Sequence, residues 1–344
     1  MNEHNNFFER YKVTKKLGEG SFGSVFQCIN IQTNNIYAIK KITIKKDTTS
    51  LKRILREVLL LKYLKHEHLI GMNEACLAYE EQQTSLYFVM ELMQMNLRDL
   101  IKTKRSFLTN DHIKFYMYQI FLALAYLHYN NIVHRDIKPD NILINSDNVI
   151  KIADFGWARH ISKDCDLTKM ICNIHYRAPE ICFRNTIHND KVDIWSVGCL
   201  FYEIITTNVL FTAQKDILLL KSIISKFGNL IEDEITFIEK DEAQNWVRKQ
   251  GQTKKINPSF YLGDFPDNDA KDLFDKCMEI DPRKRISAFE ALNHPYFKEI
   301  YDFEEVKDGL IKHSSHIDFK FETDENISGF QLFKRIEEET RNSK

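Results

Sequence analysis

The chain has 344 residues, 43% of them hydrophobic, which is enough for a sizeable core and, on length alone, for about two domains. Its 48 basic and 49 acidic residues nearly cancel, which excludes a strong overall attraction to nucleic acid or to a membrane surface. The seven cysteines form no C-x-x-C pair, so we expect neither a zinc site nor a disulfide framework. The apolar stretch 194–211 contains Glu203 and several polar residues, which fits a buried helix better than a membrane span.

Residues 1–10 are polar and are expected to be loose, and a strand pattern begins at Tyr11. The strand runs into a glycine-rich turn, LGEGSFGSV (17–25), and resumes after it. Glycines 18, 20 and 23 have no side chains, so the backbone N–H groups of this turn can approach phosphate oxygens closely. Dinucleotide-binding folds place such a loop between a strand and a helix, whereas this one lies between two strands.

The next strand, 36–42, contains Lys40, a candidate anchor for phosphate groups. Residues 51–65 are predicted to form a helix, because their apolar residues recur at i, i+3, i+4 and i+7, and Ser50 is the expected N-cap. Glu57 lies in the middle of this helix and is the candidate ion-pair partner of Lys40.

Strands near 70–79 and 85–91 follow, and the apolar alternation stops at ELMQMN (91–96). This stretch is the expected hinge between a small β-rich lobe and a larger helical one. Further helices are predicted at 97–103, 110–130, 193–207, 215–227 and 268–279, with Thr109 or Asn110 as the cap of the second.

Residues 132–157 are predicted to carry the chemistry. The loop HRDIKPDN (134–141) follows a short apolar strand, and a hairpin of strands 142–144 and 149–153 leads to Asp154. Two carboxylates, an amide and an ammonium would gather there, from Asp136, Asp154, Asn141 and Lys138. A carboxylate can accept a hydroxyl proton, oxygen ligands suit Mg²⁺, and an ammonium can neutralise a phosphoryl group in transit. The pattern indicates phosphoryl transfer.

The octet 134–141, the DFG at 154–156 and the APE at 178–180 match the protein-kinase motifs in order. Throughout 11–297 the chain resembles a eukaryotic serine/threonine protein kinase of the CMGC group, and most of all the mitogen-activated protein kinase family. The features that favour this family are an insert at about 231–265, the acidic segment YDFEE (301–305), and a C-terminal stretch at 319–341.

The resemblance implies an α+β, two-lobed kinase fold. The β-rich N-lobe with one key helix would span about 11–91, the hinge about 91–96, and the mostly helical C-lobe about 97–297. Residues 298–344 would form an extension that returns toward the N-lobe.

It also implies the roles of individual residues. Asp136 would orient or accept the substrate hydroxyl proton, Lys138 would support the γ-phosphate, and Lys40 with Glu57 would hold the other phosphates. Asn141 and Asp154 would bind Mg²⁺, Glu180 would pair with Arg285, and Asp193 would anchor the catalytic loop. The ATP site would be formed by Leu17, Gly18, Glu19, Gly20, Ser21, Phe22, Gly23, Ser24, Val25, Ala38, Lys40, Met90, Glu91 and Met93.

The segment 154–180 departs from the family. Thr168 stands at the position of the activating phosphothreonine, and Arg56, Arg135 and Arg159 stand where relatives clamp its phosphate. The usual T-x-Y is Thr168-Lys169-Met170, and Ile174 replaces one of the two arginines that would receive a phosphotyrosine. Phosphorylation of Thr168 alone is therefore the expected switch.

Four further positions bear on activity and specificity. Asn173 and His175 replace a threonine and a tryptophan, so we expect lowered or retuned activity. The resemblance implies that Trp157 after the DFG would favour serine acceptors and that Arg177 would favour proline after the acceptor.

Two alternatives differ from this interpretation. A cyclin-dependent kinase also uses a single activating threonine, but the chain reads LKRILRE at 51–57, which lacks the cyclin-docking signature. A pseudokinase scaffold would usually have lost Lys40, Asp136 or Asp154, and all three are present.

The expected cofactors are ATP and Mg²⁺, and the expected partners are serine/threonine protein substrates and an upstream activating kinase. Basic docking motifs would bind Asp302, Glu304 and Glu305, whereas nucleic acid and membranes are not expected partners. The N-terminus lacks the apolar core of a signal peptide, so we expect a soluble protein in the cytoplasm and nucleus.

Overall fold

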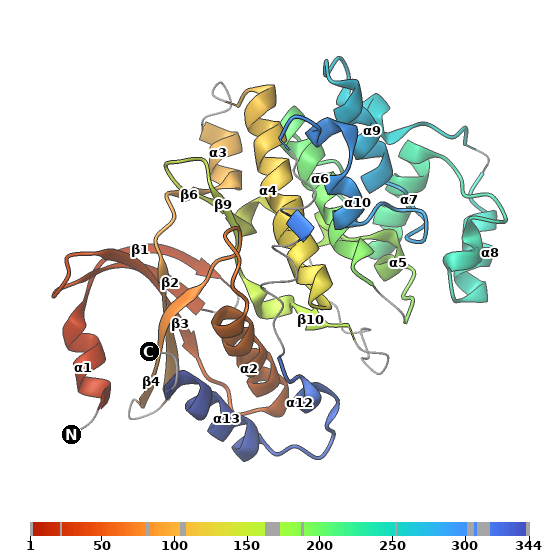
Figure 1. The fold of residues 1–344 in the computed structure, drawn as a ribbon. Coiled ribbons are helices and arrows are strands. Elements are labelled where there is room, and N and C mark those ends of the chain that lie inside the picture. Colours follow the sequence, from red (N-terminus) through yellow and green to blue (C-terminus); the bar gives the residue numbers. More distant parts are fainter. Residues whose placement is uncertain are drawn as a thin grey trace. The chain divides into compact units, whose positions relative to one another are not determined.

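A computed structural model of the chain describes residues 3–20, 23–79, 83–103, 108–161, 173–186, 189–251, 253–300, 306–307 and 317–341. The chain divides into two compact units. The first contains Met1–Gln94, Ala153–Ala158 and Ser315–Lys344, and the second contains Met95–Ile152 and Arg159–Ser314. Figure 1 gives the elements of both units.

The first unit is built on an antiparallel sheet of five strands in the order β1-β2-β3-β5-β4 within the described residues. Its strands are β1 (Tyr11–Gly20), β2 (Gly23–Asn30), β3 (Ile36–Thr43), β4 (Met72–Tyr79) and β5 (Thr84–Glu91). Helix α2 (Thr48–Tyr63) follows β3 and buries its apolar stripe, including Leu51, Ile54, Leu55 and Val58. Its N-cap is Asp47, whose side chain accepts a hydrogen bond from the Ser50 N–H, so the prediction of Ser50 as the cap was wrong.

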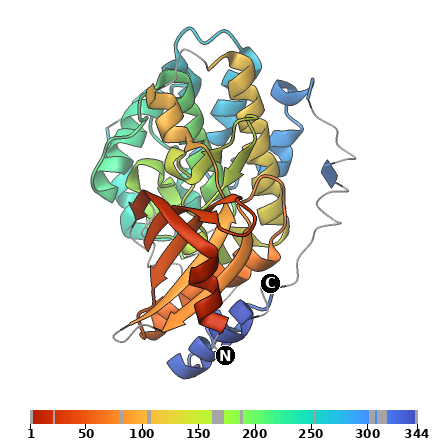
Figure 2. The same cartoon turned by 90° about the vertical axis from the view of Figure 1, so that its left-hand side faces the viewer.

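The N-terminal residues form a helix, α1 (Glu3–Arg10), which lies across the strands of this sheet in Figure 2. Phe7 is 2% exposed and packs with Cys28, Ile39 and Val89, and Arg10 forms an ion pair with Glu74. The prediction that residues 1–10 are loose was therefore wrong for residues 3–10, and residues 1 and 2 lie outside the described part of the chain. Burial of one aromatic ring orders a segment that has little helical periodicity of its own.

The C-terminal residues of the first unit pack on α2 and β4. They form α12 (Lys320–Thr323) and α13 (Gly329–Arg341), and α13, dark blue in Figure 1, lies beside α2. Leu332, Ile336 and Thr340 are its buried residues, and Glu339 forms an ion pair with Lys62 of α2. The extension is thus a packed part of the first unit.

The second unit is mainly helical. Its helices are α3 (Leu97–Thr103), α4 (Asn110–Tyr129), α5 (Pro179–Cys182), α6 (Lys191–Thr206), α7 (Asp216–Phe227), α8 (Asp241–Arg248), α9 (Asn268–Cys277) and α10 (Ala288–Leu292). Its short strands are β6 (Met95–Asn96), β7 (Ile132–Val133), β8 (Ile142–Ile144), β9 (Ile150–Ile152) and β10 (Arg159–His160). Strands β8 and β9 pair as the predicted hairpin, and Thr109 caps α4 as predicted.

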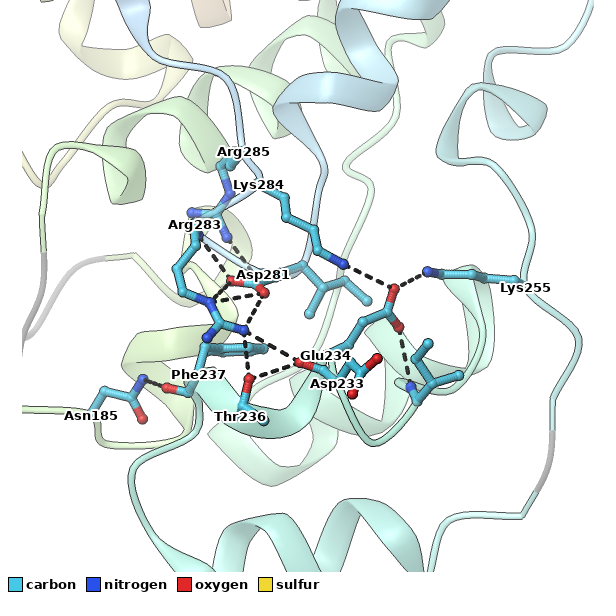
Figure 3. A network of polar contacts seen from close by, with 12 residues as sticks. Asn185, Asp233, Glu234, Thr236, Phe237, Lys255, Asp281, Arg283, Lys284 and Arg285 are labelled. Carbon is cyan, nitrogen blue, oxygen red and sulfur yellow. Dashed lines mark hydrogen bonds and ion pairs between the residues drawn. The ribbon is translucent and has the colours of Figure 1, made fainter.

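The insert 231–265 is tied to the chain before α10 by a polar network, shown in Figure 3. Glu234 is 4% exposed, accepts a hydrogen bond from Lys255 and forms an ion pair with Lys284 over 3.7 Å. Arg283 pairs with the fully buried Asp281 and donates to the hydroxyl of Thr236 over 2.8 Å. The insert is therefore fixed to the body of the second unit.

Two sequence expectations concern the whole chain. The described cysteines 28, 76, 182, 199 and 277 are free thiols. Among the described helices, none is both long enough and apolar enough to traverse a membrane.

Candidate active site

In the first unit, Lys40 is held by two carboxylates. Its Nζ lies 2.6 Å from Oε1 of Glu57 and 3.2 Å from Oδ1 of Asp154. Burial by itself would lower the pKa of Lys40, but the two carboxylates outweigh it and raise that pKa above its usual value. The side chain is therefore a fixed cation.

The predicted nucleotide-binding residues lie on neighbouring strands of the same sheet. Ala38 pairs with Met90 of β5, and Lys40 pairs with Val25 of β2. Strand β1 contains Leu17, Gly18, Glu19 and Gly20, and strand β2 contains Gly23 and Ser24. Glu91 is the last residue of β5, and Met93 follows it in the chain. Ser21 and Phe22 are outside the described residues.

Gly18 and Gly23 of the loop differ in the space around their Cα atoms. A Cβ at Gly23 would lie 2.0 Å from the carbonyl oxygen of Lys41, and φ there is +152°, so the hairpin closes only with glycine. A Cβ at Gly18 would meet nothing within 4 Å, so the backbone there borders open space. The loop can thus accept a group close to its main chain.

In the second unit, the loop 134–141 gathers three of the predicted catalytic side chains. Lys138 Nζ donates to Asp136 Oδ2 over 2.6 Å, and Asn141 Nδ2 donates to that same oxygen over 2.8 Å. A further bond from Asn141 Nδ2 to the Asp136 carbonyl, also 2.8 Å, closes the loop. Because the amide nitrogen of Asn141 is used in this way, its oxygen is left to act as a ligand.

Asp193 anchors this loop from the first turn of α6. Its carboxylate accepts the backbone N–H groups of His134 and Arg135 over 2.8 and 2.7 Å, and a ring nitrogen of His128 lies 3.0 Å away. Burial would raise the pKa of Asp193, but its hydrogen bond with His128 and the neighbouring positive groups lower it below the usual value. This anchor holds Arg135 at a φ of +70°, an uncommon conformation for a side chain of that size.

Two ion-pair clusters brace the second unit. Glu180 forms a double hydrogen bond with Arg285 over 2.7 and 3.0 Å, as predicted. The second cluster, which was not predicted, joins Arg98, Glu203 and Tyr176, with Tyr176 donating to Glu203 over 2.6 Å. The single charge in the apolar run 194–211 was the sequence signal for it, because a buried carboxylate needs a partner.

The three arginines that were predicted to bind phospho-Thr168 belong to different units: Arg56 to the first, and Arg135 and Arg159 to the second. Arg56 is 1% exposed on α2 and is paired with Glu322 of α12. In the second unit, Arg159 of β10 pairs with Val133, two residues before Arg135. Thr168 lies outside the described residues, as do Asp302, Glu304 and Glu305.

Neither Glu322 nor Asp216 was predicted to have a role. Glu322 holds Arg56 in the first unit, and Asp216, the first residue of α7, forms an ion pair with Arg177 in the second. Each partner is far away in sequence, so no spacing pattern could have identified it.

Comparisons with known proteins agree with this arrangement. The family model described as "Protein kinase domain" matches residues 11–297. The chain is 36% identical over 296 residues to "Mitogen-activated protein kinase homolog NTF3" of Nicotiana tabacum, a match that covers 85% of this chain and 79% of that protein. It is 35% identical to "Mitogen-activated protein kinase 3" of Oryza sativa subsp. japonica, over 85% of this chain and 80% of that protein.

"Extracellular signal-regulated kinase 1" of Dictyostelium discoideum is also 35% identical, over 85% of this chain and 56% of that longer protein. The fold, the motif residues and these relatives lead to one assignment. The chain belongs to the protein kinase family and, within it, to the mitogen-activated protein kinase-like serine/threonine kinases.

Proposed function

We propose that this kinase uses Mg-ATP, transfers the γ-phosphoryl group to serine or threonine followed by proline, and is switched by phosphorylation of Thr168 alone. Membership of the family implies ATP, a divalent metal, protein substrates and an upstream kinase. The observation that carries the catalytic part is the Asp136–Lys138–Asn141 network, held by Asp193.

In this proposal Asp136 accepts the proton of the substrate hydroxyl, and the neighbouring Lys138 ammonium stabilises negative charge on the transferred phosphoryl group. Lys40, kept protonated by Glu57, binds the other phosphates. The carboxylate of Asp154 and the amide oxygen of Asn141 fit a hard cation and would hold Mg²⁺, which neutralises phosphate charge when bound.

The geometry of Arg56 supports Thr168 as the switch. The guanidinium is almost fully buried, and its Nη1 has no hydrogen-bond partner among the described residues. A buried donor of this kind favours an added anion. We assign that anion to phospho-Thr168, with Arg135 and Arg159 as further ligands.

The Arg177–Asp216 pair supports activation without phosphotyrosine. Arg177 is the remaining one of two arginines that would receive that group, and Ile174 stands in place of the other. The Arg177 side chain is only 14% exposed, and Asp216 already supplies a carboxylate. A phosphotyrosine at this position would have to compete with Asp216 for the Arg177 guanidinium.

The test uses homogeneous protein whose Thr168 phosphorylation is measured by mass spectrometry. Phosphorylation by an upstream kinase should raise kcat/KM of the wild-type chain by about 100-fold or more, but not that of Thr168→Val. Thr212→Val, a change at an exposed threonine of the second unit, is the matched control and should respond like wild type. Full activity of unphosphorylated Thr168→Val would overturn the switch, and a peptide library without a preference for proline would overturn the specificity.

A further inference from the structure

Arg98 of α3 contacts three other parts of the second unit. Its Nη2 donates to Oδ2 of Asp140 over 3.0 Å and to the hydroxyl of Tyr176 over 2.7 Å, and its Nη1 forms an ion pair with Glu203. Asp140 belongs to the loop 134–141, Tyr176 to the segment before α5, and Glu203 to α6. We call these four residues the Arg98 cluster.

The three partners of Arg98 form a binding site for a guanidinium group. A guanidinium presents its N–H donors in a fixed planar fork, and carboxylates are the acceptors that match it. Glu203 is 3% exposed and also accepts the hydroxyl proton of Tyr176 over 2.6 Å, so its carboxylate is held in place. In the part of the chain that the structure describes, Arg98 is the one cation paired with Asp140 or Glu203. The chain thus fills this site with its own side chain.

The outer side of the cluster is open to solvent. The side chain of Asp140 is 46% exposed, whereas that of Arg98 is 19% exposed. An ion pair that only braces the interior would need Glu203 alone, and a carboxylate as exposed as Asp140 adds little stability because water screens it. Asp140 instead gives the cation site a face that a molecule in solution can reach.

This open face belongs to the loop that holds the proposed proton acceptor. Asp140 follows Asp136 by four residues, and its neighbour Asn141 donates to the carbonyl and the carboxylate of Asp136 over 2.8 Å each. Because the loop closes on itself in this way, Asp140 lies within a few residue lengths of Asp136. A protein substrate whose hydroxyl reaches Asp136 therefore brings its neighbouring side chains to this face.

We propose that Arg98 determines substrate specificity: it occupies the cation site of Asp140 and Glu203 and thereby excludes arginine and lysine next to the acceptor residue of the substrate. A second cation at the site would meet the positive charge of Arg98, which is unfavourable. Removal of Arg98 should convert the excluded side chain into a preferred one. The use of the site by a substrate rests on the proposed function, whereas the binding of a guanidinium group there does not.

The first test compares peptides that differ in one side chain. Each has a serine followed by proline, and carries either arginine or citrulline, its uncharged isostere, placed in turn at each position around that pair. The measured quantity is the ratio of kcat/KM for the arginine peptide to kcat/KM for the citrulline peptide. General damage to the enzyme cancels in this ratio, so a merely structural role of Arg98 would leave it unchanged.

The site variant is Arg98→Ala, and Lys102→Ala is the matched control, since it removes an exposed positive charge from the same helix. In the wild type and the control, we expect a ratio of about one or less at every position. In Arg98→Ala the ratio should rise about tenfold or more at one position, because the substrate arginine now pairs with the two carboxylates. Adding Asp140→Asn to Arg98→Ala should remove most of this gain.

The second test uses ethylguanidinium, without substrate or nucleotide. Arg98→Ala leaves the buried carboxylate of Glu203 without a cation, so the melting temperature should fall. Millimolar ethylguanidinium should restore part of this loss, and ethylammonium should restore less, since it lacks the planar fork. The wild type, whose site is filled, should not respond. If Arg98→Ala does not fold, Arg98→Lys replaces it in both tests and should shift both readouts less, in the same direction.

An arginine-to-citrulline ratio that is the same in the wild type and Arg98→Ala would overturn the proposal. So would a preference for arginine in the wild type, an equal gain in Lys102→Ala, or equal responses of the wild type and Arg98→Ala to ethylguanidinium. If no form of the chain transfers phosphate, the proposed function fails, and the response of Arg98→Ala to ethylguanidinium still decides whether the cluster is a cation site.

Discussion

Glu322 holds Arg56 through two hydrogen bonds, one of them 2.7 Å long between Arg56 Nη2 and Glu322 Oε2. The arginine precedes Glu57, which binds Lys40, and the glutamate comes from the C-terminal part of the first unit. Lys52 of the same helix donates to the carbonyl oxygens of Glu322 and Asp324, over 3.1 and 2.9 Å. The C-terminal residues thus contribute directly to the position of the helix that carries Glu57.

Glu322→Ala should destabilise the chain by about 3–5 kcal/mol, because it leaves the buried guanidinium of Arg56 without its carboxylate. Urea unfolding measures the effect, and Glu325→Ala, at an exposed position nearby, is the control. If Arg56 also binds phospho-Thr168, phosphorylation should restore part of the lost stability. A change of less than about 1 kcal/mol would contradict the importance of this pair.

Lys40→Met should lower kcat/KM by about 100-fold or more, since the fixed cation between Glu57 and Asp154 is lost. Lys41→Met makes the same change one position along β3, where the side chain points to the other face of the sheet. That control should keep most of the activity in a peptide phosphorylation assay. Equal losses in both variants would indicate damage to the sheet rather than loss of a specific contact.

Asp136→Asn should lower kcat by about 10²–10⁴-fold and change the affinity for ATP little, because it removes the proposed proton acceptor. Asp140→Asn is the control, since Asp140 lies in the same loop but pairs with Arg98 and not with the catalytic network. Single-turnover phosphorylation separates the chemical step from binding. Turnover that survives the Asp136 change would contradict the assignment.

Asp193 should make the stability of the folded chain depend on pH in the acidic range. Because the pKa of Asp193 is lowered in the folded chain, its contribution is complete above the ordinary carboxyl value of about 4 and is lost as the pH falls through the folded value. The melting temperature of Asp193→Asn should therefore fall less than that of the wild type between about pH 5 and pH 3. Parallel pH profiles for the two proteins would argue against a charged Asp193.

Phe7→Ala should cost about 3–5 kcal/mol of unfolding free energy, because the ring is only 2% exposed among Cys28, Ile39 and Val89. Phe8→Ala removes the same side chain one residue later, where it is 49% exposed, and should cost much less. Chemical denaturation of both variants gives the comparison. Equal and small effects would mean that α1 does not pack on the sheet in solution.

The sequence alone was sufficient to identify the motif residues. Asp136, Lys138 and Asn141 lie within one loop, and Lys40 and Glu57 lie on adjacent elements, so short spacing and local periodicity identify them. The same holds for most helices, because their apolar stripes repeat every three or four residues. The cap of α2 was missed because Asp47 and Ser50 are both good capping residues and only the backbone path distinguishes them.

Tertiary structure decided the partners of the arginines and the order of the N-terminus. Glu322 and Asp216 are two of 49 acidic residues, and nothing in their neighbours along the chain marks them as partners of Arg56 and Arg177. A buried guanidinium requires some carboxylate, but folding alone determines which one reaches it. In the same way α1 forms because the sheet offers a place for Phe7, a contact that no local pattern encodes.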